Sequence, residues 1–203
     1  MPIHWSPETA AVVAALVGAF IGGLFAGPYQ HARDYFNRPK LKLDFPEKDG
    51  GRVVGDRKDK KTGVEIIEHY VRVRVRNLGK RTAKNTRVYL ASLHEIHRAG
   101  QSTPTIVHDA AQLCWAGWNF QPRDVPPGVT FFVDLVAVST SESGWNFSLE
   151  HMFASHRSLW GFKGTLRFEI VVTADNAEFT SCFVDIEYRQ DWHTLSAAEY
   201  FPN

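Results

Sequence analysis

Three histidines and one cysteine form the one cluster in this 203-residue sequence whose side-chain types suit a transition metal. They are His94, His97, His108 and Cys114. Zinc needs three or four such ligands at about 2.0 to 2.3 Å. Neither a paired Cys-x-x-Cys spacing nor the His-Glu-x-x-His helix pattern is present to bring them together. We therefore expect no metal site and no cofactor. The alternative is a metal-dependent or accessory subunit of a membrane enzyme complex that uses the three histidines.

A row of basic residues is the second candidate for chemistry. Alternation along a strand places Arg72, Arg74 and Arg76 on one face, and Lys80 and Arg81 follow in the adjoining turn. Such a patch suits anionic lipid headgroups or phosphates. Arginines on a strand face also pair with acidic residues of neighbouring strands, and we favour that interpretation. Because the net charge is only +1 and no nucleic-acid-binding motif is present, we expect no nucleic-acid partner.

Tryptophans gather in two stretches, 95–124 and 141–163, that interrupt an otherwise regular pattern of short strands. The four candidates for a partner surface are Trp115, Trp118, Trp145 and Trp160. Aromatic clusters beside a core either cap it or form a docking surface. The sequence leaves both interpretations open and does not identify a protein partner.

The two cysteines, Cys114 and Cys182, are too few for a disulfide framework. They would stay reduced in the cytosol, whereas a periplasmic domain would allow them to pair. Cys114 lies between Leu113 and Trp115, which predicts a buried core thiol rather than a nucleophile. Since no residue stands out as catalytic, we expect a protein that is not an enzyme.

From residue 40 onward, apolar residues recur with a period of two, which is typical of half-buried strands. No alternation of strands and helices appears, and the turns are rich in Gly, Pro, Asn and Asp. These features predict a mainly β protein, an antiparallel sandwich of about seven to nine strands. The stretch 46–62 is predicted to be a solvated hairpin or a mobile loop. The expected strands cover 40–45, 65–76, 86–93, 112–116, 130–139, 165–173 and 178–188.

The N-terminal segment differs in character from the rest. Residues 9–30 carry no ionisable side chain other than Tyr29, and 22 residues at about 1.5 Å each can cross a hydrocarbon core of about 30 Å. No Lys or Arg precedes the segment, which argues against a secretion signal. Basic residues follow it, and the positive-inside rule then places the C-terminal side in the cytoplasm. We expect a single-pass plasma-membrane (inner-membrane) protein with its N-terminus outside, an anchor over 1–37 and a domain over 38–203.

Glycines form two Gly-x-x-x-Gly matches in this segment, Gly18 with Gly22 and Gly23 with Gly27. Close backbone approach through small residues is the usual route by which membrane helices pack together. The helix is thus a candidate for self-association or for packing on a partner helix. The alternative is that Gly and Ala are simply common in such helices.

Three stretches of the domain resemble bacterial domains of the CARDB-like and fibronectin-III-like kind. Residues 70–90 are similar to their strand, Asn-x-Gly turn and following strand, residues 125–135 to their Pro-Gly turn and next strand, and residues 164–176 to their penultimate strand. The resemblance implies an immunoglobulin-like sandwich used for binding, spacing or adhesion without catalysis. We therefore expect a membrane-anchored binding or scaffolding protein, with a periplasmic adhesion-type module as the reversed-topology alternative.

Overall fold

The computed structural model describes residues 11, 15, 19, 30, 33, 35–46, 51–58, 63, 65–97, 101–104, 110–117, 120–141, 144–149, 163–189 and 192–202. The chain divides into two compact units, Met1–Arg38 and Pro39–Asn203. Within the described residues, no helix combines the length and apolar character that a membrane span requires. Most of the apolar N-terminal segment, including Gly18, Gly22, Gly23 and Gly27, lies outside the described residues. The transmembrane helix therefore stays a prediction.

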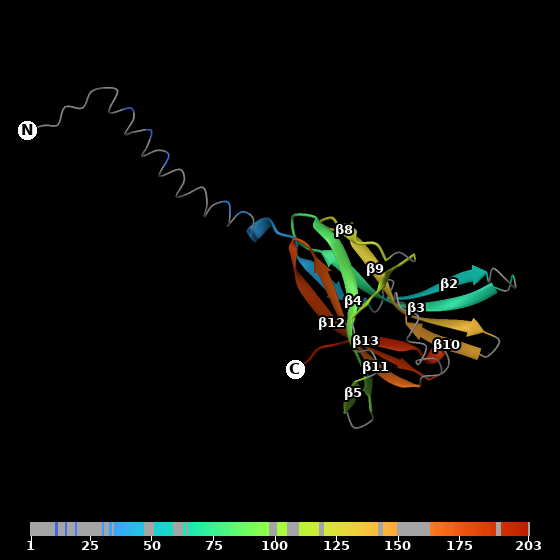
Figure 1. Cartoon of the computed structure of the whole chain (residues 1–203). Coiled ribbons are helices and arrows are strands. Elements are labelled where there is room, and N and C mark those ends of the chain that lie inside the picture. Colours follow the sequence, from blue (N-terminus) through green and yellow to red (C-terminus); the bar gives the residue numbers. More distant parts are fainter. Residues whose placement is uncertain are drawn as a thin grey trace, which may run out of the picture. The chain divides into compact units, whose positions relative to one another are not determined.

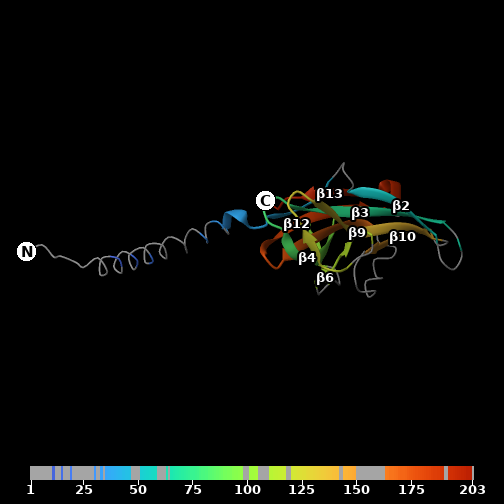
Figure 2. The ribbon, with the colours of Figure 1, turned by 90° about the horizontal axis from the view of Figure 1, so that it is seen from above.

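The second unit consists of two antiparallel sheets (Figure 1). Among the described residues, the first sheet has six strands in the order β1-β3-β9-β10, with β2 also on β3 and β7 on β9. Viewed from above, β3 and β9 run side by side in this sheet (Figure 2). Its strands are β1 (Leu41–Asp44), β2 (Arg52–Lys58), β3 (Glu65–Asn77), β7 (Cys114–Trp115), β9 (Thr130–Ser141) and β10 (Gly144–Leu149).

The second sheet has seven strands among the described residues, in the order β13-β12-β11-β4-β5, with β6 and β8 also on β4. A short 3-10 helix, η2 (Trp192–Thr194), joins β12 to β13. The strands are β4 (Ala83–Ile96), β5 (Ser102–Pro104), β6 (Ala111–Gln112), β8 (Arg123–Val125), β11 (Gly164–Ala174), β12 (Ala177–Tyr188) and β13 (Ser196–Tyr200).

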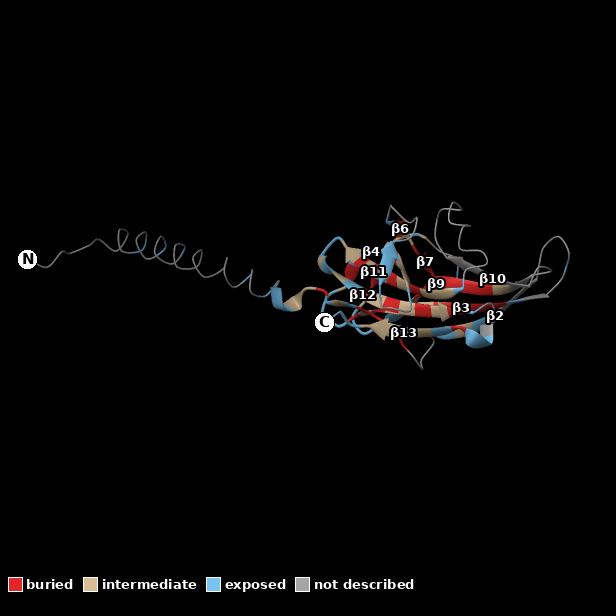
Figure 3. Cartoon of the chain, turned by 90° about the horizontal axis from the view of Figure 1, so that it is seen from below, coloured by how far each residue is buried: buried red, intermediate tan, exposed pale blue. Residues whose placement is uncertain are grey.

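The core lies between the sheets and follows the period-two pattern (Figure 3). Every second residue of β3 from Val71 to Val75 is fully buried, and so is every second residue of β11 from Leu166 to Val172. Each such side chain contributes about 1.5 to 3 kcal/mol by leaving water. The expectation of a mainly β protein built from antiparallel sheets is therefore confirmed, but the described residues form thirteen strands rather than about seven to nine, because several are short segments of two or three residues.

The structure selects one of two alternatives for one expected element and divides another. Residues 52–58, expected within a hairpin or loop, form β2 and pair with β3 in a hairpin whose last pair joins Lys58 to Glu65. Val54 is 62% exposed on this edge strand. An exposed valine weakens the alternation of apolar and polar residues by which a half-buried strand is predicted from sequence. The single strand expected at 112–116 is split, because the chain crosses between the sheets at the buried residue Leu113. There, β6 pairs with β4 and β7 with β9.

Gly51 occupies a position where the backbone leaves no room for a side chain. Its carbonyl accepts a hydrogen bond from Arg72 N at 2.7 Å, and a Cβ added to it would meet Pro46 O at 2.1 Å. We expect Gly51→Ala to lower the free energy of unfolding by about 1 to 3 kcal/mol, since the edge strand must shift. Thermal unfolding followed by circular dichroism measures the loss.

The matched control for Gly51 is Gly55→Ala on β2, where the new Cβ would lie 3.4 Å from Tyr70 Cε2, an ordinary contact. We expect its stability to stay within about 0.5 kcal/mol of the native chain. Equal losses in the two variants would contradict the steric argument.

Candidate functional site

The arginine row, Arg72, Arg74 and Arg76 on β3, is paired with carboxylates of both neighbouring strands. Arg72 Nε lies 2.5 Å from Asp134 Oδ1 on β9. Arg74 donates two hydrogen bonds to Asp44 on β1, at 2.9 and 3.1 Å, and Arg76 Nη2 donates to the same carboxylate at 2.7 Å. The register explains this pairing, because Asp134 stands opposite Arg72 and Asp44 stands opposite Arg74.

The arginine row, which is part of the predicted basic patch, is therefore paired with acidic neighbours. The sequence analysis favoured this interpretation. The remaining two residues, Lys80 and Arg81, are exposed in the turn between β3 and β4.

The two carboxylates of the row shift in opposite directions. Burial alone would raise the pKa of Asp44, but the hydrogen bonds and charges of Arg74 and Arg76 outweigh it and leave the pKa below its ordinary value. Burial raises the pKa of Asp134 above its ordinary value, because Arg72 opposes it only in part. Asp44 therefore adds stability that is lost as the pH falls through its folded pKa. Asp134 adds stability at low pH that is lost as the pH rises through its folded pKa.

Asn77, at the end of β3, is fully buried and uses its amide to join three segments. Its Nδ2 group donates to Arg81 O at 2.7 Å and to Val125 O at 2.8 Å. Its Oδ1 accepts from Lys40 N at 3.1 Å and from Gly79 N at 2.9 Å. The side chain thus holds the start of β1, the β3–β4 turn and β8 together at the end where the chain enters the sandwich.

The candidate metal ligands that the structure describes lie on elements of different sheets. His94 lies on β4 of the second sheet, and just beyond it the His97 ring bonds to Thr103 Oγ1 at 2.9 Å. Cys114 is on β7 of the first sheet, and His108 lies outside the described residues. No group of three or more His, Cys, Asp or Glu side chains in the described part of the chain could hold a metal ion.

Both cysteines are free thiols buried in the sandwich. Burial raises the pKa of Cys182, and the nearby carboxylates of Glu199 and Asp44 raise it further. The Cys182 thiol therefore stays protonated at neutral pH, which makes it a core residue rather than a nucleophile.

Trp115 belongs to the core and not to an accessible surface. It is 1% exposed, packs edge to face on Phe131 at 6.0 Å, and donates its indole N–H to Gln121 O at 3.1 Å. Its place on β7 explains the difference, because the chain has just crossed between the sheets at Leu113 and the Trp115 side chain joins the core cluster. The side chains of Trp118, Trp145 and Trp160 lie outside the described residues.

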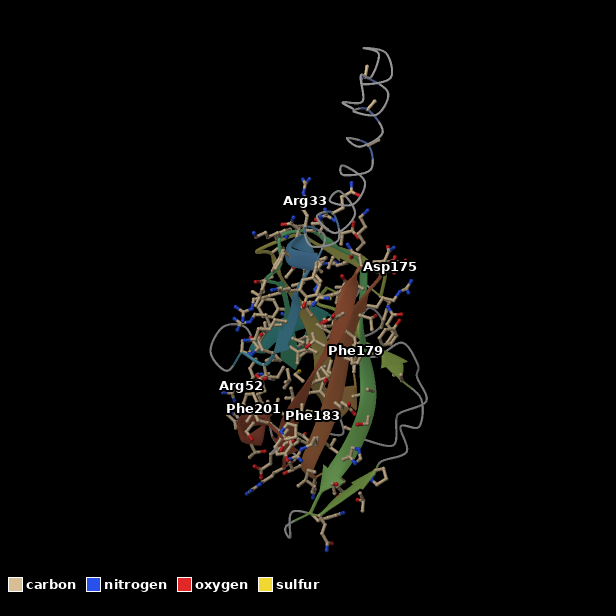
Figure 4. The ribbon with its side chains drawn as sticks, turned by 90° about the vertical axis from the view of Figure 1, so that its left-hand side faces the viewer. Arg33, Arg52, Asp175, Phe179, Phe183 and Phe201 are labelled. Atoms are coloured by element: carbon tan, nitrogen blue, oxygen red, sulfur yellow. The ribbon has the colours of Figure 1, made fainter. Side chains whose placement is uncertain are left out.

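Two exposed and two half-buried aromatic residues, which the sequence analysis did not single out, lie on β12, on β13 and directly after β13. We call Phe179, Phe183, Tyr200 and Phe201 the aromatic face. Figure 4 shows the three phenylalanines of the set on one side of the domain. Phe179 is 74% exposed and Phe201 is 73% exposed. Phe179 and Phe183 share one face of β12 with Ser181, Asp185 and Glu187, and the buried residues of the strand alternate with them from Cys182 to Tyr188.

The middle of the aromatic face is held in one geometry. The rings of Phe183 and Tyr200 meet edge to face at 6.3 Å. The Arg167 guanidinium lies 3.2 Å from the centre of the Tyr200 ring. Asp185 fixes that guanidinium with two hydrogen bonds, at 2.7 and 2.8 Å. The face therefore combines ordered aromatic rings with an arginine whose orientation is set before any partner arrives.

Comparison with known proteins adds no relative. No protein-family model matches the sequence, and no curated protein matches it either.

Proposed function

We propose that this chain is a non-enzymatic binding or scaffolding protein, anchored in the plasma membrane by residues 10–27, with its sandwich in the cytoplasm. The aromatic face is the observation that carries the proposal. Phenylalanines that are about three-quarters exposed lose favourable burial energy unless another surface covers them. The resemblance to CARDB-like and fibronectin-III-like domains supports an immunoglobulin-like role in binding.

The composition of the face favours a protein partner that offers aliphatic or aromatic side chains. Protein interfaces are enriched in aromatic residues and arginine and depleted of lysine at their centres. The sequences of β12 and β13 contain no lysine, and Arg167 is already neutralised by Asp185. Ordered Tyr and Arg side chains are also typical binding hot spots, because little entropy is lost when they are covered.

Photo-crosslinking in living cells tests the partner. A photoreactive amino acid is placed at Phe179 or at Phe201 in the full-length chain, and at exposed Arg87 on β4 as the matched control. We expect one discrete adduct of the same mass from the first two positions and none from the third. Phe183→Ser should remove the adduct.

An adduct of twice the mass of the chain would mean that a second copy covers the face, which would overturn the partner claim. No adduct from either phenylalanine position would overturn the aromatic face as a binding surface. The anchor is tested separately, since the full-length chain should stay in the membrane pellet after carbonate extraction. Release into the supernatant would overturn the membrane proposal.

A further inference from the structure

A pocket of about 240 Å³ opens between β2, β3 and the η2 segment. Its polar lining is cationic or can become so: Arg52 comes from β2, His69 from β3 and His193 from η2. Val53, Val54 and Leu195 supply apolar walls. No Asp or Glu is among the described residues that line it. The pocket therefore pairs an apolar wall with basic groups from three separate elements.

A hydrogen bond between elements of the two sheets orients the Arg52 side chain. Its Nη1 group donates a hydrogen bond to Leu195 O at 3.1 Å, which links β2 to the segment before β13. The guanidinium carries five N–H donors in a planar fork that matches a carboxylate or phosphate. A side chain oriented in this way loses little freedom when an anion arrives.

The two imidazoles, His69 and His193, interact electrostatically. Burial lowers the pKa of His69, and the charge of His193 lowers it further. Arg52 on β2 lines the same pocket as His69; Glu68 and Tyr70 adjoin His69 along β3, where successive side chains point to opposite faces, and the Tyr70 hydroxyl donates to the Glu68 carboxylate. On its other side, β9 places the apolar residue Val138 opposite His69. A bound anion would oppose the repulsion between the basic groups and favour the protonated rings.

From this arrangement we propose that the pocket binds a small organic anion: an apolar body that carries one carboxylate or phosphate group. Arg52 and the two histidines contact the anionic group, and the valines and Leu195 contact the apolar body. The volume lies below the roughly 300 to 1,000 Å³ of pockets for drug-sized ligands, which restricts the ligand to a small molecule.

Calorimetric titration of the purified full-length chain in a neutral detergent tests the proposal. The probes are benzoate, its neutral isostere benzamide, phenyl phosphate and inorganic phosphate. We expect benzoate or phenyl phosphate to bind at about pH 6 and to bind about tenfold more weakly at about pH 8, because the lowered pKa of His69 leaves that ring neutral there. Whichever of the two binds more tightly identifies the anionic group. Benzamide and inorganic phosphate should bind at least about tenfold more weakly than that probe.

Two exposed variants probe the recognition without disturbing the core. Arg52→Gln and His193→Gln should each weaken binding by about tenfold, the loss expected for a hydrogen bond to a charged group. Arg87→Gln, an exposed arginine on β4, is the matched control and should bind like the native chain. A pH titration followed by nuclear magnetic resonance should show that saturating ligand raises the pKa of His69. A purely structural role of the pocket predicts no such change.

Equal binding of benzamide and benzoate would overturn the recognition of an anion. No binding of either organic anion at about pH 6, or native affinity in both Arg52→Gln and His193→Gln, would overturn the site itself.

Discussion

Arg72→Met should lower the free energy of unfolding at neutral pH by about 3 to 5 kcal/mol, because it removes the cation that faces a buried carboxylate. Asp134 is 2% exposed, and Arg72 is its ion-pair partner across the β3–β9 pairing. The methionine keeps most of the apolar stem of arginine, so the loss reports the missing charge and hydrogen bond rather than a cavity.

The pH dependence of this variant identifies the cause. The pKa of Asp134 already lies above its ordinary value of 3.8, because burial outweighs the effect of Arg72. Without Arg72 the folded pKa rises further, while the pKa in the unfolded chain does not change. The folded state then holds a proton that the unfolded state has released. The Asp134 contribution to the stability of Arg72→Met should therefore be most favourable below about pH 3.8 and should be lost as the pH rises through the folded pKa, so the deficit relative to the native chain grows with pH.

Urea titrations at about pH 4 and about pH 7, followed by the fluorescence of buried tryptophan, measure both effects. Adding Asp134→Asn to Arg72→Met should recover much of the loss and remove the added pH dependence. Arg167→Met is the matched control, because its carboxylate partner Asp185 is 26% exposed, and the expected cost is about 1 kcal/mol or less. A similar loss in both arginine variants, or a loss that does not change with pH, would contradict the argument.

Asn77→Ala is expected to cost about 3 kcal/mol or more of the free energy of unfolding. The substitution leaves two carbonyls and two N–H groups without their side-chain partner, and each buried polar group in that state costs about 1 to 3 kcal/mol. The same urea titration measures the loss.

Asn176 provides a close control. Its amide also bonds two backbone groups, accepting from Lys84 N at 2.8 Å and donating to Thr82 O at 3.0 Å, but the residue is exposed. Water can replace those bonds, so Asn176→Ala should cost about 1 kcal/mol or less. Comparable losses in the two variants would mean that burial does not set the value of the Asn77 network.

The arginine row illustrates what depends on strand pairing. Alternation in the sequence placed Arg72, Arg74 and Arg76 on one face of a strand, because that pattern is a property of neighbouring residues. Their carboxylate partners are 30 to 62 residues away along the chain. Which aspartate faces which arginine follows from β1 and β9 lying on either side of β3, and a different register would leave the same charges unpaired.

For the candidate metal ligands and for the pocket residues too, the tertiary structure decides which side chains become neighbours. His97 and Cys114 are close in sequence, yet the chain crosses between the sheets at Leu113 and places them in different layers. Conversely, His193 is distant in the sequence from Arg52 and His69, yet all three line one pocket. Spacing along the chain argued against a metal site in the first group, but it did not indicate the meeting of the second.

The sequence by itself determined the class of this protein. Period-two hydrophobicity sets β-strands and their inward faces through local steric and hydrophobic effects, and turn residues end them. Only the tertiary structure decided which charges are neutralised, that Trp115 is buried and that Phe179 is exposed. Those outcomes depend on contacts between strands that are distant in sequence, and the free energy of such contacts is set by pairing, register and burial rather than by the local pattern.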